Sequence, residues 1–493
     1  MSQDQFDKDL RSMQDARRLV ERSRIAQREF ASASAAKVDA VCEAMAEAAY
    51  QAAASLAVMA HEETGYGNAE HKTIKNQHAS RGVWESIREM PTVGIIERDA
   101  TRKMVTMAEP VGVIAALTPT TNPTSTAIYK AMIAVKGRNS IVISPHPSAA
   151  KCTAEAVRII SAAAECAGAP AGLVSCMEEV SLAGTQELIR HYGVNLILAT
   201  GGGPMVRAAH SVGKPAYGVG PGNVPAWVDR SADLRKAAQD LVASKSFDCS
   251  LICATEQSVV ADAQIAPELR RLMEAEGAHW LNEQEVARMG ALLFHPDGAM
   301  NTAWVGKSAR VLAQAIDMRV ADTTKVLVAP LAGIGRVHAL SREKLTTVLG
   351  FITASTPAEG LALCQAILKF GGDGHTAVLH SRNEEQVENM AALLPAFRIV
   401  VNSMSTLGSV GRTCGFSPSF TLGTGGIGGA ISGDNITATH LINRKRVGWE
   451  ISPWLPAVQT TPNADAESAP DIDDVVSQVL ARLRQSGDKA FAR

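Results

Sequence analysis

Cys253 is the residue of this chain best suited to covalent chemistry. It stands in the segment Lys-Ser-Phe-Asp-Cys-Ser-Leu-Ile-Cys-Ala-Thr-Glu-Gln, which runs from Lys245 to Gln257. A cysteine thiolate is strongly nucleophilic even when only a small fraction of the thiol is ionised. A thiol that adds to an aldehyde carbonyl forms a thiohemiacetal, from which hydride can pass to a nicotinamide to leave a thioester. We therefore expect Cys253 to be a nucleophile.

Two glycine-rich turns lie upstream of this cysteine. The first, Ala-Thr-Gly-Gly-Gly-Pro, begins at Ala199, and the second, Gly-Val-Gly-Pro-Gly-Asn, begins at Gly218. Glycine lets a backbone approach a pyrophosphate closely, and the helix N-terminus that Pro204 predicts offers unpaired N–H donors. The spacing is not Gly-x-Gly-x-x-Gly, so the first turn alone is as compatible with an ordinary tight turn as with a phosphate contact.

Asn122 is a third candidate for chemistry. It lies in Leu-Thr-Pro-Thr-Thr-Asn-Pro, from Leu117 to Pro123, directly after a predicted strand. Its amide N–H could point at a developing alkoxide, and removal of one such donor commonly costs ~3 kcal/mol of transition-state stabilisation. The alternative is a simple Asn-Pro turn.

Composition narrows the classes of protein that the chain can be. At 493 residues it predicts two or three domains, and its contents of 46% hydrophobic and 20% charged residues are those of an ordinary globular protein. A formal net charge of -2 argues against a nucleic-acid partner. No run reaches the ~20 apolar residues of a membrane helix, and the N-terminus lacks the apolar centre of a signal peptide. The eight cysteines are scattered and form no Cys-x-x-Cys pair, so we expect neither disulfides nor a metal site. This cysteine usage predicts a cytoplasmic location.

The order of predicted elements indicates the fold class. Residues 6–63 have apolar positions at helical spacing, and residues 93–113 predict a hairpin. Strands and helices then alternate in two series, on either side of about residue 230. The first has strands at 112–117, 140–144 and 195–200, with helices at 124–135, 149–167 and 205–212. The second has strands at 257–261, 325–329 and 376–380, with helices at 266–276 and 357–370. Such alternation predicts an α/β fold with doubly wound parallel sheets.

The C-terminal residues have a different pattern. Residues 451–470 contain four prolines with Thr, Asn, Ala and Ser, a composition typical of linkers. Apolar residues then recur at intervals of three and one, from Ile472 to Leu483, and Asp471 is a plausible cap. The pattern predicts one amphipathic helix over 471–484.

Taken together, these segments resemble the aldehyde dehydrogenase superfamily, and within it the CoA-acylating branch, from about Arg18 to Val447. The motifs that carry the resemblance are Glu62-Glu-Thr-Gly, Thr118-Pro-Thr-Thr-Asn-Pro-Thr, Ser144-Pro-His-Pro-Ser, Gly218-Val-Gly-Pro-Gly-Asn, Ile252-Cys-Ala-Thr-Glu-Gln, Glu343-Lys-Leu, Gly374-His-Thr-Ala and Pro418-Ser-Phe-Thr-Leu-Gly.

The resemblance implies roles for individual residues. Cys253 would be the nucleophile and Asn122 the side-chain donor of the oxyanion hole, with the Cys253 backbone N–H as second donor. His375 would belong to the acyl-transfer pocket, or be a structural histidine bonded to backbone. The residues that would bind the dinucleotide are Thr118, Pro119, His146, Gly201, Gly202, Val219 and Glu343, the last on the nicotinamide ribose.

One absence bears on the reaction. Hydrolytic relatives carry a glutamate at the start of the second glycine segment, where it activates water, and this chain has Gly218 there. Without that base, the thiolate of coenzyme A is the natural acceptor of the acyl group. The implied reaction converts an aldehyde, CoA and NAD(P)⁺ into acyl-CoA and NAD(P)H. The alternatives are a hydrolytic dehydrogenase, an acylating sulfoacetaldehyde dehydrogenase of cytosolic sulfonate metabolism, and a scaffold protein without activity.

Two departures concern the shape of the site. Relatives commonly have Asn-Gly where this chain has Cys249-Ser250, so Cys249 is either a second thiol in the site or a packed small residue. Ala149 stands where an NAD-selective relative holds an acidic side chain, which leaves both NAD and NADP open as cofactors. The resemblance implies no metal.

The resemblance also implies a domain order. We expect a dinucleotide-binding domain over 1–230 with an oligomerisation hairpin at about 93–107, a catalytic thiol domain over 231–425, a return to the bridging β element over 426–450, the linker and the helix. This element would build a homodimer or homotetramer. The helix is similar to encapsulation peptides, so a bacterial microcompartment shell protein is an expected partner; the alternative is a helix that docks on its own oligomer. Because the chain lacks the alcohol dehydrogenase part of fused relatives, we expect it to make one of their two reductions.

Overall fold

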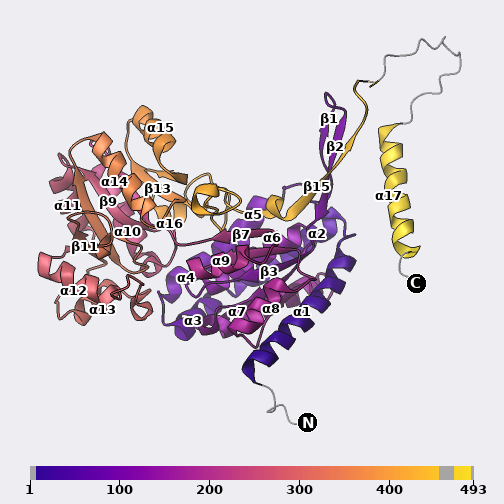
Figure 1. The fold of residues 1–493 in the computed structure, drawn as a ribbon, viewed down its shortest axis with the longest axis horizontal. Coiled ribbons are helices and arrows are strands. Elements are labelled where there is room, and N and C mark those ends of the chain that lie inside the picture. Colours follow the sequence, from indigo (N-terminus) through magenta and orange to yellow (C-terminus); the bar gives the residue numbers. More distant parts are fainter. Residues whose placement is uncertain (1–6, 453, 455–470, 490–493) are drawn as a thin grey trace. The chain divides into compact units, whose positions relative to one another are not determined.

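The computed structural model describes residues 7–452, 454 and 471–489. Thr106–Arg446 and the described residues up to Glu97 form one compact unit, and Arg98–Val105 with the described residues from Val447 onward form a second. Figure 1 shows the ribbon. No helix within these residues is both long enough and apolar enough to cross a bilayer.

Helices occupy the first part of the chain, as its apolar spacing predicts. They are α1 (Lys8–Phe30), α2 (Ala35–Gln51), α3 (Ala53–Thr64), α4 (Ala69–Gln77) and α5 (Val83–Ile87). The Asp7 side chain accepts the Leu10 N–H at 2.8 Å and so caps α1. Gly65, with φ at 66°, ends α3 in the left-handed conformation that glycine adopts without strain.

The first sheet has the order β5-β4-β3-β6-β7, and all of its neighbouring strands are parallel. Its strands are β3 (Val113–Leu117), β4 (Ser140–Ser144), β5 (Val174–Cys176), β6 (Leu196–Thr200) and β7 (Ala216–Val219). The sequence pattern predicts β3, β4 and β6 correctly. It misses both short edge strands, β5 and β7, and β7 runs into the glycines of the second turn.

Helices cover both faces of this sheet. They are α6 (Pro123–Lys136), α7 (Ala150–Cys166), α8 (Leu182–Arg190) and α9 (Gly203–His210). Alternate residues of β3 point to opposite faces. Ile114 and Ala116 pack in the core that includes α2, α6 and α7, whereas Ala115 and Leu117 pack in the core that includes α1 and α8. The sheet is therefore buried on both sides, as a doubly wound sheet requires.

The second sheet has the order β10-β11-β12-β9-β8-β13-β14 and is also parallel between all neighbours. Its strands are β8 (Val224–Val228), β9 (Glu256–Asp262), β10 (Ala278–Trp280), β11 (Val326–Pro330), β12 (Val348–Ala354), β13 (Gly374–His380) and β14 (Ala396–Val401). The helices of this part are α10 (Leu234–Ser246), α11 (Ala266–Ala275), α12 (Glu283–Leu293), α13 (Ala309–Ala315), α14 (Pro357–Lys369), α15 (Glu384–Leu393) and α16 (Ser405–Gly408).

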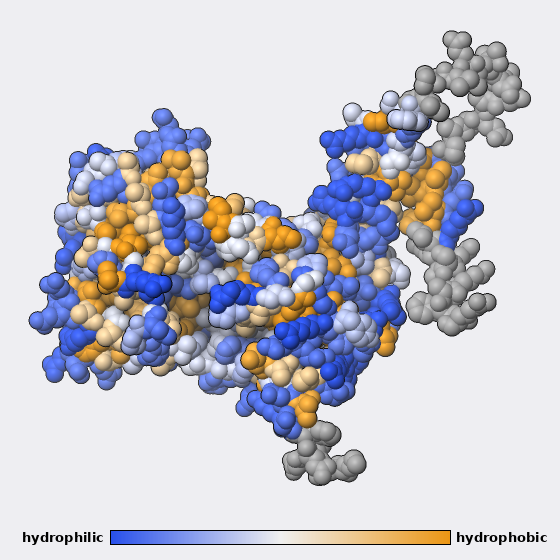
Figure 2. Space-filling model, in the orientation of Figure 1, coloured by the Kyte–Doolittle hydropathy of each residue, from blue (hydrophilic) through white to orange (hydrophobic). Residues whose placement is uncertain are grey.

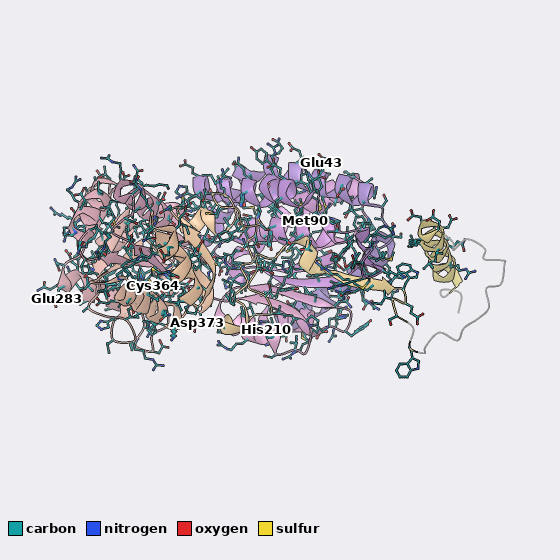
Figure 3. The ribbon with its side chains drawn as sticks, turned by 90° about the horizontal axis from the view of Figure 1, so that it is seen from above. Glu43, Met90, His210, Glu283, Cys364 and Asp373 are labelled. Atoms are coloured by element: carbon teal, nitrogen blue, oxygen red, sulfur yellow. The ribbon has the colours of Figure 1, made fainter. Side chains whose placement is uncertain are left out.

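The chain passes from the first sheet to the second at residues 220–223, between β7 and β8. It returns after β14, and Phe420, Ile436 and Leu441 pack in the core beside α6. Figure 3 labels His210 and Met90 in the part built on the first sheet and Cys364 and Asp373 in the part built on the second. The two parts, each built on a parallel sheet with helices, confirm the predicted α/β fold class.

A third sheet has the order β1-β2-β15, with β1 (Gly94–Asp99), β2 (Met104–Pro110) and β15 (Ile442–Gly448). Its first two strands form the hairpin predicted at 93–107. The C-terminal helix, α17, spans Ile472–Lys489, which is longer than the 471–484 predicted. Of the predicted linker 451–470, all but 451, 452 and 454 lie outside the described residues. Figure 2 shows hydrophilic residues over most of one face, with smaller apolar patches among them.

Candidate active site

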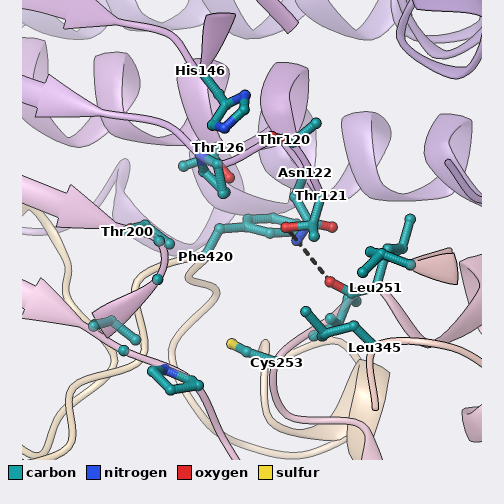
Figure 4. Close-up of a pocket in the computed structure, with 18 of the residues that line it drawn as sticks. Thr120, Thr121, Asn122, Thr126, His146, Thr200, Leu251, Cys253, Leu345 and Phe420 are labelled. Carbon is teal, nitrogen blue, oxygen red and sulfur yellow. Dashed lines mark hydrogen bonds between the residues drawn. The ribbon is translucent and has the colours of Figure 1, made fainter. Parts of the chain in front are cut away.

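A cavity of about 300 Å³ lies where the carboxyl ends of β3, β4 and β6 face the segment before β9. Figure 4 shows its walls, with Asn122 and His146 on the side of the first sheet and Cys253 opposite. Ligand sites of open α/β sheets form beyond the carboxyl ends of their strands. This cavity brings together residues that are 131 positions apart in the sequence (122 and 253).

Cys253 lies in the turn between a short 3-10 segment, Phe247–Ser250, and β9. Leu251 and Ile252 before it are buried, and the thiol is partly buried at the cavity wall. Removal of the thiol from solvent and the nearby carboxylate of Glu343 raise the pKa of Cys253 to about 12. The thiol is therefore neutral at physiological pH.

His375 is the nearest partner of this thiol. It is the second residue of β13 and fully buried, and its Nε2 lies 3.2 Å from the Cys253 Sγ. The Nδ1 atom lies 2.9 Å from the Thr376 Oγ1, which also accepts from Arg398 Nε at 3.3 Å. Arg398 donates to that hydroxyl, which can either accept an Nδ1–H or donate to Nδ1; the tautomer with the proton on Nδ1 is the one that turns the Nε2 lone pair toward Sγ. Burial and the Arg398 charge lower the pKa of His375 well below its ordinary value.

Asn122 ends the loop after β3, and Pro123 begins α6 at its first position. Its Nδ2 donates to the Leu251 carbonyl at 3.1 Å, the dashed line of Figure 4, and to the Thr121 Oγ1 at 3.0 Å. Its Oδ1 accepts from Lys75 Nζ at 2.6 Å. The amide nitrogen therefore lies on the side of the nucleophile segment.

Most residues expected to bind a dinucleotide lie in the same cavity. The cavity-lining residues of that set are Pro119, His146, Gly201, Gly202, Val219 and Glu343. Gly201 and Gly202 precede the first turn of α9. Glu343 accepts the Gly222 N–H at 3.1 Å, and its burial raises its pKa to about 7. Thr118 is fully buried and does not line the cavity; its hydroxyl has no hydrogen-bond partner among the described residues.

These features fit a dinucleotide. A Cβ added at Gly220 would meet no atom within 4 Å, so the backbone there is open to a ligand. The N-terminal turn of α9 offers backbone N–H groups to a pyrophosphate, and Glu343 offers a carboxylate to a ribose hydroxyl.

Gly218 lies in β7 and does not line the cavity. A Cβ there would come within 2.5 Å of His210 Nε2 and 2.7 Å of Val206 Cγ1, so a side chain at this position would first meet α9. Among the cavity-lining residues, Glu343 is the one carboxylate. Glu343 is therefore the candidate base for activating water in this cavity.

Sequence reasoning did not find several residues of the site. Cys249 is buried and does not line the cavity, which favours the packed-residue interpretation. Tyr66 and Phe420 line the cavity. Tyr66 directly follows the motif Glu62-Glu-Thr-Gly, and Phe420 belongs to the motif Pro418-Ser-Phe-Thr-Leu-Gly, but the resemblance assigned a role to neither residue. Lys75, Asp248 and Arg398 gave no signal, because lysine, aspartate and arginine are ordinarily exposed.

The chain is similar in sequence and in fold to known proteins. A model of the aldehyde dehydrogenase family matches residues 8–439. The aldehyde-alcohol dehydrogenase of Streptococcus pneumoniae is 42% identical over 410 residues, which cover 81% of this chain and 46% of that protein. The acetylating aldehyde dehydrogenase of Geobacillus thermoglucosidasius has a structure with a TM-score of 0.90 and 44% identity, covering 92% of this chain and 100% of that one.

A propionaldehyde dehydrogenase of Rhodopseudomonas palustris, solved with bound CoA and an acylated cysteine, has a TM-score of 0.80 and 29% identity, covering 88% of this chain and 97% of that one. The chain spans about half the length of the first curated relatives that it matches. The family match, the two parallel sheets and the cysteine-lined cavity agree, and the chain belongs to the aldehyde dehydrogenase family.

Proposed function

We propose that this chain is a CoA-acylating aldehyde dehydrogenase that oxidises a small uncharged aldehyde to its acyl-CoA, with NAD or NADP as the oxidant. The observation that carries the proposal is the neutral thiol of Cys253, 3.2 Å from a neutral imidazole, in a cavity that also holds Asn122 and the glycine turn. The similarity to an acetylating enzyme and to one with bound CoA supports the acyl acceptor.

The first step follows from the pair of neutral groups. His375 Nε2 accepts the proton of Cys253 as the sulfur adds to the aldehyde carbonyl, so a free thiolate never has to accumulate in the buried site. This transfer needs the tautomer with the proton on Nδ1, which the Thr376 Oγ1, 2.9 Å away, would accept. Asn122 Nδ2 would exchange one of its two acceptors, the Leu251 carbonyl or the Thr121 hydroxyl, for the oxygen that becomes negative, and the Cys253 N–H would be the second donor.

A nicotinamide bound in this cavity would supply the acceptor for the hydride that leaves the thiohemiacetal. The residues that would hold the dinucleotide are Pro119, His146, Gly201, Gly202, Val219 and Glu343. The same donors from Asn122 and the Cys253 backbone then polarise the thioester carbonyl for attack by the thiol of CoA. CoA enters as its thiolate, with its thiol proton released to solvent, and the departing Cys253 sulfur recovers a proton from His375, so the reaction releases one proton overall.

The cavity walls favour uncharged aldehydes. Apolar side chains dominate the wall near the nucleophile, among them Leu251, Val305 and Phe420. The lining residues include no lysine or arginine, whereas a sulfonate or carboxylate substrate would need a cationic partner in a buried site. This favours acetaldehyde or propionaldehyde over sulfoacetaldehyde.

The test is NAD(P)H formation from acetaldehyde and propionaldehyde, with and without CoA, with the products separated by mass. The proposal expects acyl-CoA in proportion to NAD(P)H, no turnover by Cys253→Ala, and slow thioester formation by His375→Ala. Free acid formed equally fast without CoA would instead establish the hydrolytic alternative, with Glu343 as the candidate base. Equal, measurable activity of wild type and Cys253→Ala would exclude Cys253 as the nucleophile, whereas no turnover of any aldehyde by the wild type would leave only the scaffold alternative.

A finer part of the proposal concerns the C-terminal helix. Ile472, Val479 and Leu480 of α17 are 48%, 50% and 38% exposed, and we propose that this helix docks on a microcompartment shell protein. An Arg98–Asp473 ion pair of 2.9 Å ties its first turn to the hairpin, which supports the alternative that the helix docks on its own oligomer. A fluorescent protein fused to residues 471–489 should co-purify with shells, and Val479→Glu with Leu480→Glu should abolish this. If a chain truncated after Trp454 still co-purified with shells, this result would contradict docking through the helix.

We also propose a homodimer or homotetramer built through the β1-β2-β15 sheet. Six of the seven residues of β15 are exposed, and such an edge strand is normally covered by another chain or protected from pairing. Sedimentation of wild type and of a chain with Arg444→Pro, which removes one backbone donor from the strand, measures the state.

A further inference from the structure

Three charged side chains lie buried beside the active site. Lys72 and Lys75 come from one face of α4, and Asp248 comes from the segment five residues before the nucleophile. The lysines are 2% exposed and the aspartate is fully buried. Lys72 Nζ lies 3.1 Å from Asp248 Oδ2, and Lys75 contacts the same oxygen. With both lysines in their ammonium forms the cluster carries one excess positive charge; burial lowers the pKa of Lys75 to about 8, so its ammonium form predominates at neutral pH.

The backbone is shaped to place this carboxylate. Asp248, Cys249 and Ser250 have φ angles of 45°, 53° and 67°, a conformation that residues other than glycine rarely adopt and that costs energy. The Asp248 Oδ1 accepts the Asn68 N–H at 2.8 Å. A Cβ at Gly67 would come within 1.9 Å of that oxygen, so the close approach depends on glycine. Buried charges persist only when they are paired and fully hydrogen-bonded.

Lys75 makes a second contact, with the amide of Asn122. Its Nζ donates to Asn122 Oδ1 at 2.6 Å, and because an ammonium group has only donors, the oxygen of the amide must face it. The nitrogen of the amide is thereby directed to the other side, where Leu251 and Thr121 accept from it. Lys75 thus joins the segment that carries Cys253 to the loop that carries Asn122.

We infer that Lys75 is a positioning residue, which orients and polarises the Asn122 amide as the donor to the oxyanion, and that Asp248 and Lys72 hold it in place. A cation bound to the amide oxygen withdraws electron density from the N–H groups, which makes them stronger donors where negative charge develops. The inference rests on the proposed function, because it assumes that an oxyanion forms beside Asn122.

A double-mutant cycle tests the inference. Asn122→Ala should lower kcat by about 10²–10³, as the loss of one oxyanion donor does. Lys75→Met should lower kcat by about 10- to 100-fold, the usual effect of removing a partner that orients a catalytic group, with little change in KM. If Lys75 acts through Asn122, the double variant is no slower than Asn122→Ala alone. Losses that multiply would overturn the inference.

A matched control separates positioning from stability. Lys136 is also buried, on α6, and Lys136→Met removes an ion pair of 2.6 Å with Asp39, whose side chain is 39% exposed. It should lower the melting temperature about as much as Lys75→Met and leave kcat within about threefold. If Lys75→Met does not fold, Lys75→Gln, which keeps an N–H donor without charge, takes its place in the cycle. Wild-type protein that forms no acyl adduct with any aldehyde would refute the proposed function, whereas equal acylation rates of wild type and Lys75→Met would refute only this inference.

Discussion

Cys253 and His375 are in contact through Sγ and Nε2, yet the structure stabilises both side chains in their neutral forms. Many cysteine enzymes instead keep a thiolate–imidazolium pair. A neutral pair is suited to a substrate that brings its own electrophilic carbonyl, since the proton can leave as the sulfur attacks.

The neutral pair predicts a distinctive pH dependence of thiol reactivity. With a Cys253 pKa of about 12, the thiolate fraction rises about tenfold for each pH unit between about pH 7 and pH 9. The rate of Cys253 alkylation by iodoacetamide should rise in parallel, with no plateau in that range. Peptide mass spectrometry of timed samples measures the rate at each cysteine. A plateau near neutral pH would mean either that the resting pair is ionised or that His375 takes the thiol proton during alkylation as well.

A side chain at position 222 would collide with Cys253 and His375. A Cβ there would lie 2.4 Å from the Cys253 carbonyl oxygen and 3.1 Å from the His375 ring. Gly222→Ala should displace both groups, with a loss of kcat of about 10²-fold and a loss of about 1–3 kcal/mol in the free energy of unfolding. Gly415→Ala, where an added Cβ meets no atom within 4 Å, should change neither in the same assays. Full activity of Gly222→Ala would show that the two groups need not hold this geometry.

The sequence predicts the elements of the site better than the contacts within it. Asn122, His146 and Gly201 were predictable, because each follows an apolar strand and the carboxyl ends of parallel strands meet at one edge of a sheet. The edge strand β7 was missed because its Gly218 and Val219 belong to a pattern that also predicts a turn. Strand order also could not be predicted, since β8 pairs with β13, some 150 residues away.

The Lys72–Asp248–Lys75 cluster could not be predicted, because it depends on three buried charges that pair only after the two α/β parts meet. One indirect signal was present. The resemblance implies Asn-Gly at the positions of Cys249 and Ser250, and these are the residue types that tolerate a positive φ. Both positions have a positive φ in this chain, although it has neither residue type there.

Glu343 predicts a pH-dependent affinity for the cofactor. Burial raises its pKa from 4.5 to about 7, so the group is mostly protonated below pH 7 and a carboxylate above it. A carboxylate accepts a ribose hydroxyl more strongly than a carboxylic acid does. The Kd for NADH should therefore fall about tenfold as pH rises from about 6 to 8, measured by nicotinamide fluorescence. Glu343→Gln should bind with a weak, pH-independent Kd; a slope retained by that variant would assign the titration to another group.

Glu63 predicts which dinucleotide the chain prefers. Ala149 carries no acidic group, but the Glu63 carboxylate from α3 accepts the N–H groups of Lys151 and Cys152, at 2.9 Å and 2.7 Å, in the first turn of α7. These N–H groups follow His146, a cavity-lining residue, and are donors that a 2′-phosphate could otherwise use. A carboxylate there occupies the donors and repels the phosphate, so we expect NAD to bind more tightly than NADP.

Replacement of this carboxylate should change the ratio of the two affinities. Glu63→Gln should reduce the preference for NAD, the ratio of the Kd values for NADPH and NADH, by about tenfold, the size of a favourable helix-terminus interaction. Glu62→Gln, at the exposed neighbouring position, is the matched control and should leave the ratio unchanged. Both constants are obtained from fluorescence titrations without aldehyde, so they do not depend on the reaction. An unchanged ratio in Glu63→Gln, in protein that melts at the wild-type temperature, would place the determinant of cofactor choice elsewhere in the cavity.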